Sequence, residues 1–221
     1  MSKNLLGTLL ALAGLLAVPA RANVIPGLFN TGLDAGGALL VGGNGVLDVH
    51  YTVISGPATG SGVTFQCCYF ADGPNSRWIS VNASGGPSAG LYDFRTTFSL
   101  AGLNPATAQI VGQFAADNLI TDILLNGSST GQTAPGFGSF VPYAIPAGSP
   151  FVTGTNTLDF MVVDQGSPMS FRNEMSGTAD PAAQAGVPEP ATAGLLGGAL
   201  GLAWLLRKAQ RQSPTATKPA Q

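Results

Sequence analysis

Lysine is absent from the central part of this chain, residues 23–187. Nine aspartates and one glutamate there face only three arginines: Arg77, Arg95 and Arg172. A surface with this excess of negative charge repels the phosphate backbone of nucleic acids. Nucleic-acid binding is therefore not an expected function of this central region.

Histidine and catalytic motifs are also scarce. The single histidine, His50, cannot complete the usual zinc set, and no Gly-x-Ser-x-Gly elbow accompanies it for a nucleophilic triad. We interpret His50 as a solvent-facing strand residue and predict that the protein is not an enzyme. A carbohydrate hydrolase is the alternative, and it would have to pair aspartates such as Asp93 and Asp159, because Glu174 is the only glutamate in the region.

The chain has only two cysteines, and they are adjacent, Cys67 and Cys68. No disulfide can therefore join distant parts of the chain. Neighbouring Cα atoms lie closer than ordinary disulfides prefer, so a bond between them needs a turned peptide. Three states stay open: a vicinal disulfide that offers a stiff apolar platform to a sugar, one buried and one exposed thiol, or an intermolecular bridge.

Helical periodicity is missing between residues 23 and 187, and alternation of apolar and polar residues takes its place. The clearest strands are predicted at 46–54, 91–100, 155–163 and 169–175, and weaker ones at 63–70, 77–81, 109–115, 122–125 and 137–143. In the first strand, one face should carry Leu47, Val49, Tyr51 and Val53. Asp48 and His50 should point the other way.

Glycine, proline and asparagine clusters separate these segments, as in the turn at residues 42–45. About nine short strands favour an all-β fold, a single antiparallel β-sandwich that is jelly-roll-like. We assign residues 23–178 to this domain and residues 179–187 to a flexible linker.

The N-terminal residues 1–22 read as a secretory signal peptide, which would form a helix. Lys3 precedes an apolar run, and Ala20 and Ala22 supply the small side chains that a signal peptidase requires. Cleavage is expected after Ala22, which places the central domain outside the inner membrane.

A second apolar run, residues 191–206, predicts a C-terminal transmembrane helix. It has roughly 16 residues, slightly short for a comfortable span, and a thin bilayer would accept it. Arg207 and Lys208 follow it and would stay on the cytoplasmic side. We assign residues 188–211 to this segment and 212–221 to a polar tail.

The C-terminal segment resembles the PEP-CTERM sorting signal of Gram-negative bacteria. The resemblance rests on Pro188, Glu189 and Pro190, on the Gly- and Leu-rich run 194–206, and on Arg207 and Lys208. It implies recognition by an exosortase, passage through the inner membrane as a precursor, and a final place on the cell surface or in the extracellular matrix. The family is associated with exopolysaccharide and biofilm formation.

The central domain is similar to lectin-like or galactose-binding-like modules. The similarity rests on Trp78 and on residues 92–98, 115–118, 125–127 and 154–158, and it implies the fold and a capacity for binding. Trp78 with Arg77 is a candidate sugar-stacking surface, with core packing of the indole as the alternative. Asp117, Asn118 and Asp122 could supply oxygen ligands for calcium, or could cap turns. No cofactor is expected.

We therefore expect an exported, non-catalytic module, structural or adhesive, that contacts extracellular polysaccharide. A secreted carbohydrate-active enzyme and an inert matrix protein without a glycan ligand are the alternatives.

Overall fold

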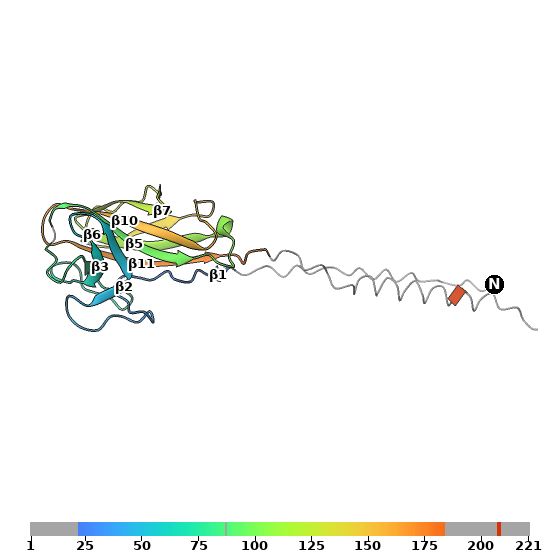
Figure 1. Cartoon of the computed structure of the whole chain (residues 1–221), viewed down its shortest axis with the longest axis horizontal. Coiled ribbons are helices and arrows are strands. Elements are labelled where there is room, and N and C mark those ends of the chain that lie inside the picture. Colours follow the sequence, from blue (N-terminus) through green and yellow to red (C-terminus); the bar gives the residue numbers. More distant parts are fainter. Residues whose placement is uncertain (1–21, 87, 184–206, 209–221) are drawn as a thin grey trace, which may run out of the picture. The chain divides into compact units, whose positions relative to one another are not determined.

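The structure is a computed structural model that describes residues 22–86, 88–183, 207 and 208 (Figure 1). The described residues from 22 to 182 belong to one compact unit, and residues 183, 207 and 208 belong to a second. The predicted signal helix with Ala20, the Pro188-Glu189-Pro190 element, the apolar run and most of the tail lie outside the described residues. Arg207 and Lys208 are helical and exposed. In the described part of the chain, no helix has the length and apolar character that a membrane span requires.

The described residues of the first unit form eleven strands in one antiparallel sheet. The strands are β1 Asn23–Val24, β2 Leu47–Ser55, β3 Gly60–Thr64, β4 Ile79–Ser80, β5 Gly90–Ser99, β6 Gln109–Asp117, β7 Leu119–Leu125, β8 Ser128–Ser129, β9 Val141–Ile145, β10 Thr155–Asp164 and β11 Ser170–Ala179. A 3-10 helix, η1, covers Pro105–Thr107. This confirms the all-β class and the antiparallel pairing.

The sheet follows the order β8-β7-β10-β5-β2-β3-β4-β11-β6-β9, and β1 pairs with β11. It curls until its two halves pack on each other. Phe160 of β10 contacts Phe171 of β11, with ring centroids 4.8 Å apart, and Tyr143 of β9 at 6.3 Å. The sandwich is thus one folded sheet, closed at one side by the short strands β3 and β4.

Alternation places the core as predicted in the long central strands. Tyr92, Phe94 and Phe98 of β5 are buried, as are Phe160 and Val162 of β10. Their neighbours along each strand point to the outer face, because successive side chains of a strand lie on opposite sides. The core of the sandwich is therefore largely aromatic.

The predicted face of β2 is wrong in its first half. Leu47 and Val49 are 50% and 54% exposed, and Asp48 is fully buried. The pairing of β2 with β3 shifts register between Leu47 and Thr52, which reverses the phase of alternation before Tyr51. The Asp48 carboxylate accepts hydrogen bonds from the backbone N–H groups of Gly32 at 2.7 Å and His50 at 2.8 Å, which holds the shifted segment.

Several strand boundaries also differ from the prediction, as for β7, β9 and β11, which were expected at 122–125, 137–143 and 169–175. The strand expected at 63–70 ends at Thr64, and residues 65–78 leave the sheet as a loop between β3 and β4. The predicted linker 179–187 begins too early. Ala179 belongs to β11, Pro181 bridges Leu103, and the Ala182 N–H donates to the Gly102 carbonyl at 2.9 Å. The domain thus extends to residue 182.

Candidate functional site

The loop of residues 65–78, between β3 and β4, packs on the sheet as a second small core. Phe65, Tyr69 and Trp78 of this loop are buried together with Ala115 of β6. Trp78 is fully buried, lies 4.6 Å from the Tyr69 ring and donates its indole N–H to the Phe70 carbonyl at 2.8 Å. The loop therefore has a fixed shape, set by aromatic packing.

Arg172 of β11 anchors this loop from below. Its side chain is 3% exposed, and its guanidinium lies 5.1 Å from the Phe70 ring and 4.9 Å from the Phe140 ring. It donates to the Ser76 hydroxyl and to the Ala71 carbonyl, both at 2.7 Å. Cation–π contacts and hydrogen bonds to charged donors are strong when they are desolvated, so Arg172 ties the loop to the sheet.

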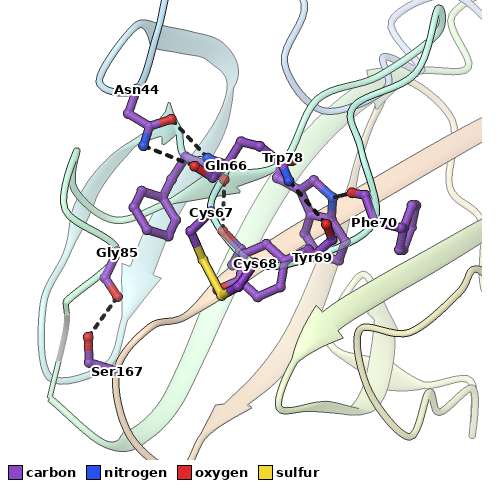
Figure 2. Close-up of a disulfide and its surroundings, with 11 residues drawn as sticks. Asn44, Gln66, Cys67, Cys68, Tyr69, Phe70, Trp78, Gly85 and Ser167 are labelled. Carbon is purple, nitrogen blue, oxygen red and sulfur yellow. Dashed lines mark hydrogen bonds between the residues drawn. A yellow bond between two sulfur atoms is a disulfide. The ribbon is translucent and has the colours of Figure 1, made fainter.

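Cys67 and Cys68 are joined by a disulfide at the exposed tip of this loop (Figure 2). The Asn44 amide holds the preceding residue, accepting from the Gln66 N–H at 2.9 Å and donating to the Gln66 carbonyl at 3.2 Å. Phe137, 39% exposed, meets Tyr69 edge-on with ring centroids 5.5 Å apart. We call Cys67, Cys68 and Phe137 the disulfide platform.

Buried oxygen atoms lie in the loop and near Tyr69. Among the described residues, five buried side-chain polar atoms have no hydrogen-bond partner. Three of them are Gln66 Oε1, the Tyr69 hydroxyl and Asp164 Oδ2. Burial raises the pKa of Tyr69, and the nearby charges of Asp117 and Asp164 raise it further. Tyr69 thus stays a neutral phenol beside two carboxylates.

For Trp78, the structure agrees with the alternative of core packing and not with the candidate sugar-stacking surface at Arg77 and Trp78. Trp78 has no exposed area to offer a ligand, because the indole fills the small core under the loop. Arg77 pairs with Asp72 at 2.9 Å and donates to the Leu40 carbonyl at 2.9 Å, with 13% of its side chain exposed. Both residues shape the loop, and Phe137 takes the exposed aromatic position.

Asp93 and Asp159, the pair that a hydrolase would need, do come together. They lie on the outer face of β5 and β10 as diagonal neighbours, since Asp159 is directly opposite Arg95. Arg95 binds Asp159 through two hydrogen bonds of 2.6 and 2.8 Å. Asp93 and Asp159 are only 9% and 1% exposed. Burial raises the pKa of Asp93 to about 6, with a further rise from the charge of Asp159 that Arg95 partly offsets.

His50 is held against the N-terminal loop, which differs from the predicted solvent-facing position. Its ring stacks on Phe29 with centroids 3.6 Å apart, and its Nε2 lies 2.7 Å from the Asp34 carbonyl oxygen. The loop around residues 29–34 folds back over β2 and covers this face. The residues that His50 contacts, Phe29 and Asp34, are 16 or more positions away, so the sequence around His50 does not predict these contacts.

Asp117, Asn118 and Asp122 do not assemble into the oxygen-ligand set that the sequence left open beside turn-capping. Asp122 accepts a hydrogen bond from the Gly131 N–H at 3.0 Å, and Asn118 accepts from the Gln165 N–H at 2.5 Å. Asp122 therefore caps the turn region near Gly131, and Asn118 ties the β6–β7 connection to the segment after β10. Within residues 22–86, 88–183 and 207–208, no group of three or more His, Cys, Asp or Glu could hold a metal ion.

Two residues near the platform escaped the sequence analysis. Asp164 continues the inward series of Leu158, Phe160 and Val162 at the end of β10, and it is 2% exposed. Asp164 follows the same alternation as these core residues, so the sequence could have predicted that its side chain is buried. Phe137 had no such signal, because its place beside Tyr69 depends on contact between two loops that are remote in sequence.

No protein-family model matches the chain, and no curated protein matches it in sequence. Among solved structures, the chain is similar to the CBM36-1 domain of a multidomain xylanase from the hindgut metagenome of Trinervitermes trinervoides. The identity is 14%, over 63% of this chain and 93% of that one, with a TM-score of 0.30.

Two further structures are similar. The Stig cyclase Fisc from Fischerella sp. TAU has 13% identity over 73% of this chain and 100% of its own, with a TM-score of 0.42. The GH26-CBM35 β-(1,4)-mannanase of Podospora anserina has 18% identity over 65% of this chain and 27% of its own, with a TM-score of 0.30. At these identities and scores, function has to be argued from the side chains of this chain alone.

Proposed function

We propose that this protein is an exported, surface-associated β-sandwich that contacts extracellular polysaccharide without catalysing a reaction on it. The observation that carries the proposal is the disulfide platform. Cys67 and Cys68 stand exposed at the tip of a packed loop, and the exposed Phe137 contacts Tyr69, the residue that follows Cys68. All three side chains are apolar and exposed.

Such a surface suits a sugar ring. A pyranose has an apolar C–H face and a rim of hydroxyl groups, so it needs a flat apolar partner with hydrogen-bonding groups nearby. A vicinal disulfide has little conformational freedom to lose on binding, and the packing of Tyr69 and Trp78 holds it in place.

The burial of Asp93 and Asp159 favours binding over hydrolysis. Glycoside hydrolysis needs two carboxyl groups that flank the scissile bond and touch the substrate. Here one carboxylate is fully occupied by Arg95, and the other lies beneath the surface.

The proposal includes the route by which the protein reaches the cell surface. Signal peptidase would remove residues 1–22, and an exosortase would recognise Pro188, Glu189 and Pro190 while the precursor sits in the inner membrane. This part rests on the sequence resemblance to PEP-CTERM proteins and on the order of motif, apolar run and basic cluster at the C-terminus.

A glycan-binding screen with the full chain, run beside a hydrolysis assay, tests the proposed contact. Intact mass after alkylation, with and without reductant, first establishes that Cys67 and Cys68 are bonded. The informative variants are Phe137→Ala and the double variant Cys67→Ser/Cys68→Ser. Val152→Ala is the matched control, because Val152 is an exposed apolar residue of another loop, 47% exposed.

We expect polysaccharide binding without turnover, and a loss of affinity of about tenfold in each platform variant, as for a central contact residue. The Val152→Ala control should bind like the natural protein. Binding that is equal in all variants would move the contact elsewhere on the molecule. Absence of any glycan ligand would favour an inert matrix protein, and turnover would favour the enzyme.

A further inference from the structure

Two buried carboxylates meet at one end of the sandwich, where β6 and β10 both end. Asp117 is the last residue of β6 and Asp164 the last of β10, and they are 5% and 2% exposed. The Asn118 N–H donates to the Val163 carbonyl at 3.0 Å, which holds the two strand ends side by side. The two side chains are close enough for the charge of Asp164 to raise the pKa of Asp117, in addition to the effect of burial.

Neither carboxylate takes part in an ion pair within the described residues, where the arginine pairs are with Asp72, Asp159 and Glu174. Asp164 Oδ1 accepts from the Gly166 N–H at 2.8 Å, but Asp164 Oδ2 is buried without a partner. The Tyr69 hydroxyl, on a side chain that is 8% exposed, lies within hydrogen-bonding reach of Asp117 and Ser170. Side-chain oxygen atoms from three different chain segments therefore converge here, and Asp164 Oδ2 among them is uncommitted.

Leaving two negative charges together in a buried place is unfavourable unless something neutralises them. The local donors are carboxylate and hydroxyl oxygens, which are the ligands that hard cations such as calcium prefer. Two carboxylates also balance the charge of a divalent ion. We propose that Asp117 and Asp164, with the Tyr69 hydroxyl beside them, bind a divalent cation of the calcium type.

A cation at this place would join the ends of β6 and β10 to the loop that carries the disulfide platform, because Tyr69 follows Cys68 directly. It would stabilise the loop from inside the domain. The inference does not depend on the proposed polysaccharide contact, since cation binding is measured without any glycan.

The test uses the full chain, treated with EDTA and then titrated with CaCl2 or MgCl2 while its thermal unfolding is followed. Asp117→Asn and Asp164→Asn remove one charge each and keep the shape of the side chain. Asp122→Asn is the matched control, because Asp122 lies close in sequence and caps Gly131 instead.

We expect calcium to raise the unfolding temperature of the natural protein. Each of the Asp117→Asn and Asp164→Asn variants should need at least about tenfold more calcium for the same rise, and Asp122→Asn should behave normally. Magnesium should act more weakly, because it demands stricter geometry and releases its waters reluctantly. No calcium response in the natural protein, an unchanged response in Asp164→Asn, or an equal response to magnesium would overturn the assignment.

A second measurement covers variants that fold poorly. Tb³⁺ takes oxygen ligands as calcium does, and Tyr69 with Trp78 beside it, ring centroids 4.6 Å apart, would sensitise its luminescence. We expect emission on excitation of the aromatic rings, displaced by calcium and persisting in Tyr69→Phe through Trp78. Emission that calcium does not displace would contradict a shared site.

Discussion

Asp93 is a buried acidic residue, and its burial disfavours the ionised form of the carboxyl group. It lies on the outer face of β5 next to the ion pair of Arg95 and Asp159, and its Oδ1 atom has no hydrogen-bond partner. Its pKa of about 6 is higher than the value near 4 that an aspartate has in an unfolded chain. The folded state therefore holds a proton on Asp93 at a pH where the unfolded state has lost it.

This difference predicts a pH dependence of stability. Since the folded state binds more protons, the free energy of unfolding should fall as pH rises from about 4 through about 6. Asp93→Asn replaces the protonated carboxyl by a neutral amide. It should therefore remove the decrease in the free energy of unfolding that the ionisation of Asp93 causes. We expect a gain of about 1 to 2 kcal/mol over the natural protein at neutral pH and little difference near pH 4.

Urea denaturation at several pH values checks this expectation. Asp180→Asn is the control, because Asp180 lies outside the cluster of Asp93, Arg95 and Asp159. Parallel stability curves for Asp93→Asn and the natural protein across the whole pH range would contradict it.

Strand β6 lies between β11 and β9 in the sheet, and at Gly112 atoms of both neighbouring strands approach its backbone closely. A Cβ atom added to Gly112 would lie 2.5 Å from the Glu174 carbonyl oxygen and 2.6 Å from the Tyr143 ring. Neither can move easily, because one is strand backbone and the other is a core aromatic whose hydroxyl donates to Asn173 at 3.0 Å. The side chain of Tyr143 therefore occupies the space that Gly112 leaves open.

Gly112→Ala should therefore destabilise the fold by about 2 to 4 kcal/mol, as overpacking of a rigid site does. Gly138→Ala is the control, because an added Cβ there meets no atom within 4 Å. Chemical denaturation of both variants measures the difference. Equal midpoints would mean that β6 can shift to accept the methyl group.

The distribution of charge over the whole chain separates three regions. The central domain has ten carboxylates and three arginines, whereas every lysine lies before residue 4 or after residue 207. Cleavage after Ala22 would leave β1 intact, because its first residue, Asn23, is already paired with Ala179. The proposed processing is thus compatible with the fold at this end.

Mass spectrometry of the mature product tests the processing. We expect an N-terminus at Asn23 and a C-terminus that has lost the segment after the Pro188-Glu189-Pro190 element. Replacing these three residues by alanine should leave the tail in place, whereas Ser213→Ala, in the trailing polar segment, should be processed normally. A full-length product with both termini intact in the cytosol would overturn the proposed route.

The course of the long strands could be read from the chain alone. Alternation is a local property, so β5, β10 and β11 and their inward aromatic residues were predictable, and so was the outward place of Asp93 and Asp159. The conformation of residues 65–78 was not predictable, because it depends on Arg172, about a hundred positions further along the chain. An apolar segment such as this one, with Phe65, Tyr69 and Phe70, suits a strand as well as a packed loop.

The candidate site illustrates the same division. Composition and the lone pair of adjacent cysteines pointed to Cys67 and Cys68, but not to the neighbours that make them a platform or to the meeting of Asp117 with Asp164. Those contacts join segments that lie 47 to 101 residues apart, as the bonds of Asn118 to Gln165 and of Arg172 to Ala71 show. Strand periodicity says which way a side chain points, and the packing of distant segments determines what it meets.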